Sequence, residues 1–289
     1  DISDDSNRSK NFGMIGAAFG LGFIIGPVIG GLLGQFGSRV PFYAAAVLCL
    51  VNFAYGYFIL PESLGKEHRR PFEWKRANPV GSLLKVRTHP EILKLFIAWF
   101  LVYLASHAVQ TNWAYFTMYK FAWDEKTVGI SLGVMGAFTA FVQGFLIRKV
   151  HPKLGSERSI LYGIMFYCTG MLLFAFAQKE WMMYAILAIY CLGGIAGPAL
   201  QSVISSKVSP KEQGDLQGAL TSVISITSII GPLLMTQIFY FFTHPDAKIK
   251  LLTLELKPPF QFSGAPFFLG FVLMAVSAYF VYYVFHRKK

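Results

Sequence analysis

One long apolar stretch, residues 92–119, carries polar side chains on a single helix face. Tyr103, His107, Gln110 and Thr111 follow one another at the three- and four-residue spacings of a helical stripe. A polar stripe on an apolar helix should face protein or water, and an imidazole there could relay a proton or contact a ligand. The same pattern also suits a neutral histidine bonded to a neighbouring helix. The sequence leaves both interpretations open.

A second polar stripe lies in the apolar stretch 216–242 and ends one turn before Pro232. Its side chains could contact a substrate, or they could bond to carbonyls of their own helix or to another helix. The stripe consists of Gln217, Thr221, Ser225 and Ser228.

Two further amides stand alone inside apolar stretches. Gln143 lies in residues 128–147 and Gln201 in residues 181–204. An amide in hydrocarbon needs a hydrogen-bond partner, so we predict that each faces a central cavity. If a substrate binds near the bilayer midplane between two halves of a protein, all these polar residues supply only one wall of its site.

No carboxylate accompanies these groups, because all 15 acidic residues lie in loops or at helix ends. Proton-coupled carriers usually keep an ionisable residue inside the bilayer. The sequence also lacks HExxH, CxxC, Walker and GxSxG motifs, which argues against an enzyme and against ATP as the energy source. Cys49, Cys168 and Cys191 have no metal-binding spacing, and we interpret them as packing residues without a metal.

The elements that must position these side chains are eight apolar stretches of transmembrane length. Hydrophobic residues make up 54% of the 289 and charged residues 14%, against roughly 25% charged in a soluble domain. A helix needs roughly 20 residues to cross the hydrocarbon core. The sequence therefore predicts an all-α integral membrane protein. The stretches are residues 12–34, 40–60, 92–119, 128–147, 159–177, 181–204, 216–242 and 265–285.

The net charge of +11 is explained by membrane topology. Most lysines and arginines fall in alternate loops, on the side that holds both ends of the chain, which predicts that both ends are cytoplasmic. These loops also suit contact with anionic lipid. The sequence has no basic stripe with interleaved aromatic residues outside the apolar stretches, so it does not indicate nucleic-acid binding. The predicted partners are the lipid bilayer and a small-molecule substrate.

Regularly spaced glycines mark the first stretch. Gly22, Gly26 and Gly30 recur every fourth residue, which gives a helix face that another helix can approach closely. Pro27 removes one backbone donor and bends the helix. Such a helix could be a sliding surface between moving parts, or a static packing groove.

The glycine pattern is repeated later in the chain. Gly13 and the Gly-Pro pair at 26–27 recur as Gly218 and the Gly-Pro pair at 231–232, an offset of 205 residues from 13 to 218 and from 26 to 231. The two stretches are six helices apart, so we predict a duplicated six-helix bundle with parallel repeats. The predicted parts are the last two helices of a first bundle (1–60), a basic cytoplasmic linker (61–91) and a complete second bundle (92–289). Four helices are expected ahead of Asp1.

The complete glycine motif resembles the fifth-helix signature of drug/proton antiporters of the major facilitator superfamily. Further matches, in order along nearly the whole chain, resemble the tetracycline efflux branch of that superfamily. The motif is Gly13, Gly22, Gly26, Pro27, Gly30 and Gly31, and the further matches include Asp1, Arg8, Phe12, Leu60-Pro61-Glu62-Ser63, Asn78-Pro79, Trp123, Gly129-Ile130-Ser131-Leu132, Gln143, Leu154-Gly155, Pro198-Ala199-Leu200-Gln201 and Leu216-Gln217-Gly218.

The resemblance implies helices five to twelve of a twelve-helix transporter in the cytoplasmic (inner) membrane. Such a transporter would confer antibiotic resistance by exporting a small amphipathic drug, tetracycline first among them, in exchange for protons, as two halves rock around a central site. The proton gradient would supply the energy without a cofactor, and a drug–metal chelate is an admissible substrate. The proton-carrying carboxylate is expected on the first helix, in the segments ahead of this chain.

The sequence departs from the superfamily's pattern at one loop, and two alternative functions stay open. The second-half echo of the superfamily's cytoplasmic loop motif, residues 144–158, contains Arg148 and Lys149 but no aspartate, so no gating charge pair is assigned. The same architecture could serve a sugar or other nutrient facilitator, because fold does not fix function. A non-transporting membrane scaffold or receptor is the alternative from another class.

Overall fold

The computed structural model describes residues 21–22, 24–59, 90–208, 213–246, 249–251 and 254–286. Within these ranges, 6 helical runs are long and apolar enough to cross a membrane, and the helix Ile24–Gly34 is shorter. The chain is therefore a multi-pass, all-α membrane protein, as its sequence predicts. The long runs are Val40–Ile59, Ile92–Phe121, Glu125–Phe176, Glu180–Ser205, Leu216–Thr243 and Ala265–His286.

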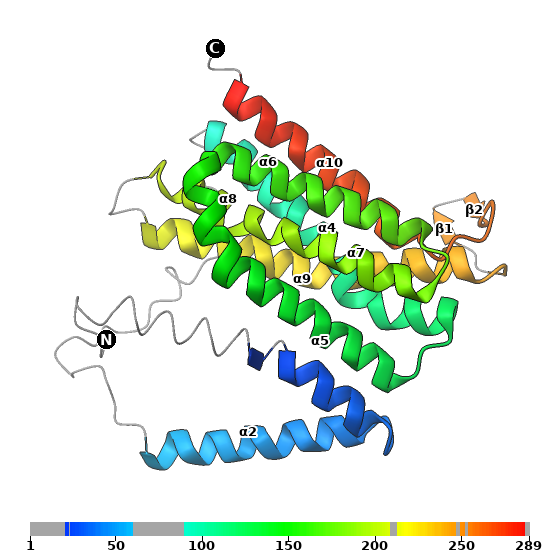
Figure 1. Cartoon of the computed structure of the whole chain (residues 1–289). Coiled ribbons are helices and arrows are strands. Elements are labelled where there is room, and N and C mark those ends of the chain that lie inside the picture. Colours follow the sequence, from blue (N-terminus) through cyan, green and yellow to red (C-terminus); the bar gives the residue numbers. More distant parts are fainter. Residues whose placement is uncertain are drawn as a thin grey trace. The chain divides into compact units, whose positions relative to one another are not determined.

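Four of the long runs are single helices that each coincide with one predicted apolar stretch (Figure 1). Each of the other two runs consists of several helical elements. The single helices are α2 (Val40–Ile59), α4 (Pro90–Phe121), α9 (Gln213–Thr243) and α10 (Ala265–His286). The first composite run contains α5 (Glu125–Phe141), a π-helical turn (Val142–Leu146) and α6 (Ile147–Phe176). The second contains α7 (Glu180–Leu192), a 3₁₀ turn (Gly193–Ile195) and α8 (Ala196–Ser205).

The run Glu125–Phe176 joins two stretches that the sequence separates. Gly155, inside α6, has a non-helical φ of 73° and ψ of 170°, so the run is kinked there. Glycine adopts this conformation without the steric penalty that a side chain would bring. The run therefore consists of two helices that meet at Gly155, in keeping with the two separate stretches 128–147 and 159–177 that the sequence predicts.

A short hairpin is the one pair of strands among the described residues. β1 (Ile249–Leu251) pairs antiparallel with β2 (Leu254–Leu256) in the connection between α9 and α10. Apolar and charged residues alternate in both strands, Ile249-Lys250-Leu251 and Leu254-Glu255-Leu256, but each strand has only 3 residues, and the sequence reasoning overlooked them. The hairpin lies outside the apolar runs and leaves the fold class unchanged.

The contacts divide the chain into two units. The first comprises Asp1–Ala77 and Trp123–Ala137, and the second comprises Asn78–Ala122 and Phe138–Lys289. This division cuts α5, whose first part contacts the helix Ile24–Gly34, whereas the sequence places its boundaries at residues 60 and 91. The assignment of 1–60, 61–91 and 92–289 to two bundles and a linker stays a prediction.

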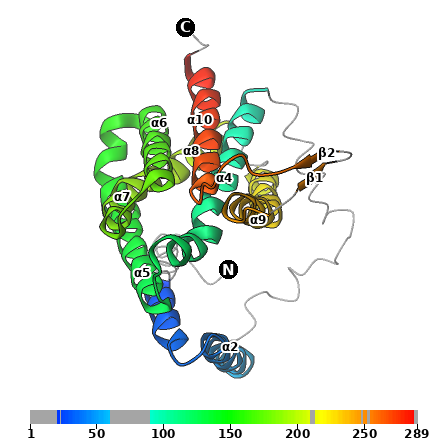
Figure 2. The same ribbon diagram turned by 90° about the vertical axis from the view of Figure 1, so that its right-hand side faces the viewer.

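In the second unit, α10 packs against α4 and α6, and α4 also packs against α9 (Figures 1 and 2). Small residues allow these contacts. A Cβ atom added to Gly270 of α10 would lie 3.3 Å from the Cβ of Ala108 in α4. The buried Ser277 hydroxyl of α10 donates a hydrogen bond of 3.0 Å to the carbonyl of Ala98. Close apolar packing and the Ser277 hydrogen bond thus both join α10 to α4.

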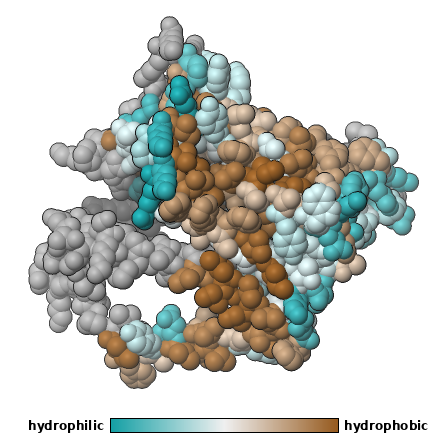
Figure 3. Space-filling view, in the orientation of Figure 1, coloured by the Kyte–Doolittle hydropathy of each residue, from teal (hydrophilic) through white to brown (hydrophobic). Residues whose placement is uncertain are grey.

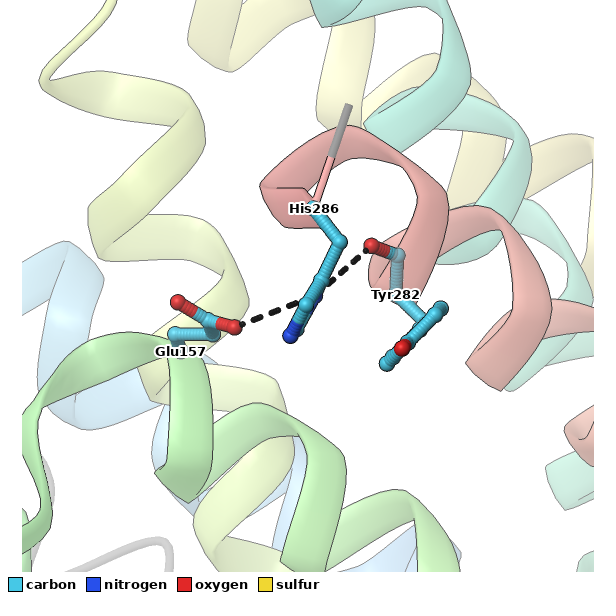
Figure 4. A network of polar contacts seen from close by, with 3 residues as sticks. All are labelled: Glu157, Tyr282 and His286. Atoms are coloured by element: carbon cyan, nitrogen blue, oxygen red, sulfur yellow. Dashed lines mark hydrogen bonds and ion pairs between the residues drawn. The ribbon is translucent and has the colours of Figure 1, made fainter. Parts of the chain in front are cut away.

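Contacts between helix ends give the relative direction of two pairs of helices in the second unit. At one end, His286 Nδ1 of α10 lies 3.5 Å from Glu157 Oε1 of α6 and 3.2 Å from the carbonyl oxygen of Tyr282 (Figure 4). At the other end, the Tyr119 hydroxyl of α4 donates to the carbonyl of Thr243 in α9, at 3.4 Å. α10 therefore runs antiparallel to the part of α6 that follows Gly155, and α4 runs parallel to α9, which agrees with the predicted order of crossings. Which end faces the cytoplasm stays a prediction.

Large apolar side chains remain exposed on the helices, as contact with lipid requires. Among the described residues, α2 has none that is buried. Phe42 and Phe58 of this helix are 74% and 80% exposed. Apolar side chains also cover much of the face shown in Figure 3. A soluble domain would bury such residues, so this surface is suited to the bilayer.

Candidate transport site

The polar stripe of α4 has a buried and an exposed part. His107 is 7% exposed, whereas Gln110 is exposed and Tyr103 and Thr111 are half-buried. The Gln110 amide donates to the Ser106 hydroxyl at 3.0 Å, and Ser106 donates to the Tyr103 carbonyl at 2.7 Å. The sequence reasoning overlooked Ser106, although it lies on the same helix face. It connects Gln110 to the backbone of α4.

His107 packs against α9 at the second Gly-Pro pair. A Cβ atom on Gly231 would overlap the imidazole ring and would lie 2.8 Å from the Cβ of His107. Gly231 therefore provides the space that the ring occupies. This geometry supports the packing interpretation of His107. It also places the polar stripe of α4 against the second Gly-Pro pair, two features that the sequence analysis treated separately.

The polar stripe of α9 is exposed along its length on the second unit. Gln217, Thr221, Ser225 and Ser228 are all exposed. Ser225 donates to the Thr221 carbonyl at 3.0 Å, and Ser228 donates to the Ile224 carbonyl at 2.9 Å. These hydroxyl protons are used within the helix, so the lone pairs of both oxygens can accept hydrogen bonds from a ligand.

A hydrogen bond between two amides joins α8 to α9. Gln201 Nε2 donates to Gln217 Oε1 at 3.1 Å. The bond brings together two residues that the sequence could assign to a cavity only one at a time. It leaves the Gln201 carbonyl and the Gln217 amino group with further hydrogen-bonding capacity. The pair therefore presents one acceptor and one donor beside the hydroxyl stripe.

Gln143 lies at a contact between two irregular helical turns. It belongs to the π-helical turn, and a Cβ atom on Gly194, in the 3₁₀ turn, would lie 3.5 Å from Gln143 Nε2. Such irregularities often mark functional positions in helices. Gln143 does not take part in the hydrogen bond between Gln201 and Gln217. The glycines at 144, 193 and 194 lie in these two turns and are a sequence feature that could have indicated the contact.

In the first unit, the glycine motif contacts α5 through backbone atoms. A Cβ atom on Gly31 would lie 2.7 Å from the carbonyl oxygen of Glu125 and 2.8 Å from the Cα of Gly129. A Cβ atom on Gly129 would lie 2.6 Å from the carbonyl oxygen of Pro27. The two backbones touch at this point, which a side chain on either glycine would prevent.

The glycine face that the sequence singled out is a different one. Cβ atoms added to Gly22, Gly26 and Gly30 would meet no described atom within 4 Å. The four-residue spacing identified a bare face, but it could not show which side of the helix contacts α5. Close approach at that bare face stays a prediction. Gly13 lies outside the described residues.

The described carboxylates stand at helix ends and turns, as predicted. Asp124 precedes α5 and accepts hydrogen bonds from the Thr127 hydroxyl at 2.5 Å and the Thr127 N–H at 2.8 Å. These hydrogen bonds, the hydroxyl first, lower the pKa of the Asp124 carboxyl. Among the described residues, no group of three or more His, Cys, Asp or Glu side chains could hold a metal ion.

Asn112 is a buried polar residue that the sequence reasoning missed. Its side chain is fully buried in α4, and within the described chain neither its amide nitrogen nor its amide oxygen has a hydrogen-bond partner. An unsatisfied buried amide costs about 1–3 kcal/mol. The signal was present in the sequence, as an asparagine inside an apolar stretch next to Thr111.

Comparison with known proteins assigns the family. Residues 1–232 match the family model described as Major Facilitator Superfamily. This chain belongs to the Major Facilitator Superfamily. Membership in a family of membrane transporters supports the prediction that the chain is not an enzyme.

Tetracycline resistance proteins are among its relatives, which confirms the resemblance seen in the sequence. The class C protein of Escherichia coli is 37% identical over 239 residues, covering 83% of this chain and 60% of that protein. The class B protein of Escherichia coli is 34% identical over 242 residues, covering 83% and 59%. The human hippocampus abundant transcript 1 protein is 26% identical over 254 residues, covering 86% and 52%. The chain spans about 60% of the length of the class C protein.

A solved transporter structure shares the fold. The crystal structure of the human organic anion transporter MFSD10 (TETRAN) matches with a TM-score of 0.66 and 20% identity. The match covers 97% of this chain and 65% of that one. It supports the transporter fold of the chain.

Proposed function

We propose that this transporter exports a small amphipathic drug of the tetracycline type in exchange for protons. The observation that carries the proposal is the exposed polar surface of α8 and α9, in a chain 37% identical to a class C tetracycline resistance protein. Tetracycline-like compounds combine apolar rings with many hydroxyl and carbonyl groups. The Gln201–Gln217 pair and the hydroxyl stripe offer both donors and acceptors to such groups.

In this proposal, α8 and α9 form one wall of a central site, with Gln110 on α4 as a further polar contact. The opposite wall and the proton-carrying carboxylate come from helices beyond the six described runs. His107 is a packing residue at Gly231 and takes no direct part in binding. The two halves rock so that the site opens to each side of the membrane in turn.

The proton gradient is the proposed energy source, and no resident cofactor is required. A drug–metal chelate is proposed as one form of the substrate. Its metal ion then travels with the drug as cargo. We place the transporter in the cytoplasmic membrane, with both ends of this chain on the cytoplasmic side.

Transport in everted membrane vesicles tests the proposal. The complete reading frame is expressed, and uptake of labelled tetracycline is followed with and without magnesium after a proton gradient is imposed. We expect uptake that stops when a proton ionophore collapses the gradient. Gradient-dependent uptake of no drug would refute the proposal, and sugar uptake independent of the gradient would identify a nutrient facilitator instead.

A further inference from the structure

A hollow of about 290 Å³ opens between the start of α6 and α8, and one of its lining residues, Ser202, adjoins Gln201 of the proposed drug site in the sequence. Four of its lining residues are apolar and three are polar. The apolar residues are Ile147, Pro152, Pro198 and Ala199, and the polar ones are Arg148, His151 and Ser202. The hollow therefore combines an apolar wall with a cationic and hydrogen-bonding rim.

The hollow lies near the ends of membrane-spanning helices. On one side is the first part of α6, shortly before the break at Gly155. On the other side is the last turn of α8, which ends at Ser205. This end of the unit is also the one where Glu157 meets His286 (Figure 4). Arg148 and Ser202 thus lie near the level of lipid headgroups.

The segment that forms one side of the hollow is strongly basic. Arg148 is exposed, so its guanidinium group is reachable from solvent. The one acidic side chain between 148 and 158, Glu157, already lies 3.5 Å from His286. The basic residues of this segment are Arg148, Lys149, Lys153 and Arg158. An anion at the rim would therefore meet little repulsion from within the segment.

We propose that this hollow binds the phosphate headgroup of an anionic membrane lipid. Arg148 contacts the phosphate, because a guanidinium fork matches two phosphate oxygens. Ser202 and His151 offer further hydrogen bonds from the two sides of the hollow. The apolar walls hold the glycerol unit and the first methylene groups, which a soluble anion would lack. Basic pockets between membrane helices are suited to such headgroups.

Native mass spectrometry of the full chain in detergent tests the site by counting bound lipids. The probes are phosphatidylglycerol and phosphatidylcholine with the same acyl chains. We expect phosphatidylglycerol to bind about fivefold or more tightly than phosphatidylcholine. Arg148→Gln should weaken phosphatidylglycerol binding about fivefold. The control Arg158→Gln removes an exposed charge of the same segment that does not line the hollow, and should change binding by less than about twofold.

A second variant tests the hollow without removing a charged residue. Ser202→Trp should fill the hollow from α8 and displace the lipid, while every basic residue is retained. Equal losses in Arg148→Gln and Arg158→Gln would indicate diffuse surface charge and overturn the site. Equal binding of the two lipids would also overturn it. Competition by glycerol phosphate as effective as that by phosphatidylglycerol would assign the hollow to a soluble anion and refute the lipid.

Discussion

The two Gly-Pro pairs of this chain have nearly the same sequence setting and different structural surroundings. In the first unit, Gly26 is open among the described residues, and the contact is made by Gly31, whose backbone touches that of Gly129. In the second unit, Gly231 itself makes the contact and accommodates the His107 ring. Near the first Gly-Pro pair, two helix backbones touch each other. At the second Gly-Pro pair, a helix backbone touches an aromatic side chain.

This difference shows that a repeated motif specifies a bare helix surface and leaves the partner to the rest of the sequence. α5 meets the helix Ile24–Gly34 with a glycine, Gly129, so the two helices approach to backbone contact. α4 meets α9 with His107, so a side chain fills the space. The first arrangement has no flexible group that could move aside, whereas the second does. The following predictions test this contrast.

The largest effect is expected at the backbone contact of the first unit. Gly31→Leu should lower the melting temperature of the purified protein by about 5 °C or more, because overpacking costs about 1–3 kcal/mol and backbone atoms cannot move aside. Differential scanning fluorimetry in detergent measures this. Gly144→Leu is the control, because a Cβ atom there meets no described atom within 4 Å and the residue lies outside the glycine motif. Equal losses in both variants would contradict the contact.

A smaller, rescuable effect is expected at Gly231. Gly231→Ala should destabilise the protein because its Cβ meets the His107 ring, and the effect should shrink when His107→Ala is present. The coupling from this double-mutant cycle should be about 0.5–3 kcal/mol. Thermal or denaturant unfolding of the four proteins provides it. Strictly additive losses would mean that the ring and the glycine are not in contact.

The Gln201–Gln217 pair between α8 and α9 should matter for transport and little for stability. Gln201→Leu and Gln217→Leu should each reduce tetracycline transport about fivefold, while the melting temperature changes little, because an exposed hydrogen bond contributes only about 1 kcal/mol. Uptake into everted vesicles is the readout. Gln237→Leu, an exposed amide elsewhere on α9, should leave transport within about twofold of wild type. A loss of transport in all three variants would remove the assignment of this surface.

The smallest effect concerns the start of α5, the helix that meets the glycine motif. Because its pKa is lowered in the folded chain, Asp124 stabilises the fold above the ordinary carboxyl pKa of about 3.9. This stabilisation is lost as the pH falls through the lowered value. Asp124→Ala should lower the melting temperature slightly at pH 7, and the difference should shrink in acid. Asp124→Asn keeps a capping oxygen and should show no such pH dependence. A pH-independent difference for Asp124→Ala would argue against the carboxylate cap.

Several features of the site were visible in the sequence because they depend only on local spacing. The exposed stripe of Gln217, Thr221, Ser225 and Ser228 follows from helical periodicity. The burial of His107 does not, because it depends on a glycine in α9 more than a hundred residues away. The bond between Gln201 and Gln217 likewise joins two separate stretches. The hairpin was missed because an alternation of 3 residues in each strand is too short a signal. The π-helical turn was missed because it lies within one uninterrupted apolar stretch, residues 128–147.

The sequence alone determined that this chain is a multi-pass helical membrane protein with bare, glycine-lined helix faces. Hydrophobicity and helical spacing are local quantities, and the bilayer enforces helices by demanding that every backbone group be hydrogen-bonded. Only the tertiary structure decided that Gly31 meets Gly129, that Gly231 holds His107, and that Gln201 pairs with Gln217. Helix partners in a membrane are selected by close packing between distant segments, since hydrophobicity does not distinguish a lipid neighbour from a protein neighbour.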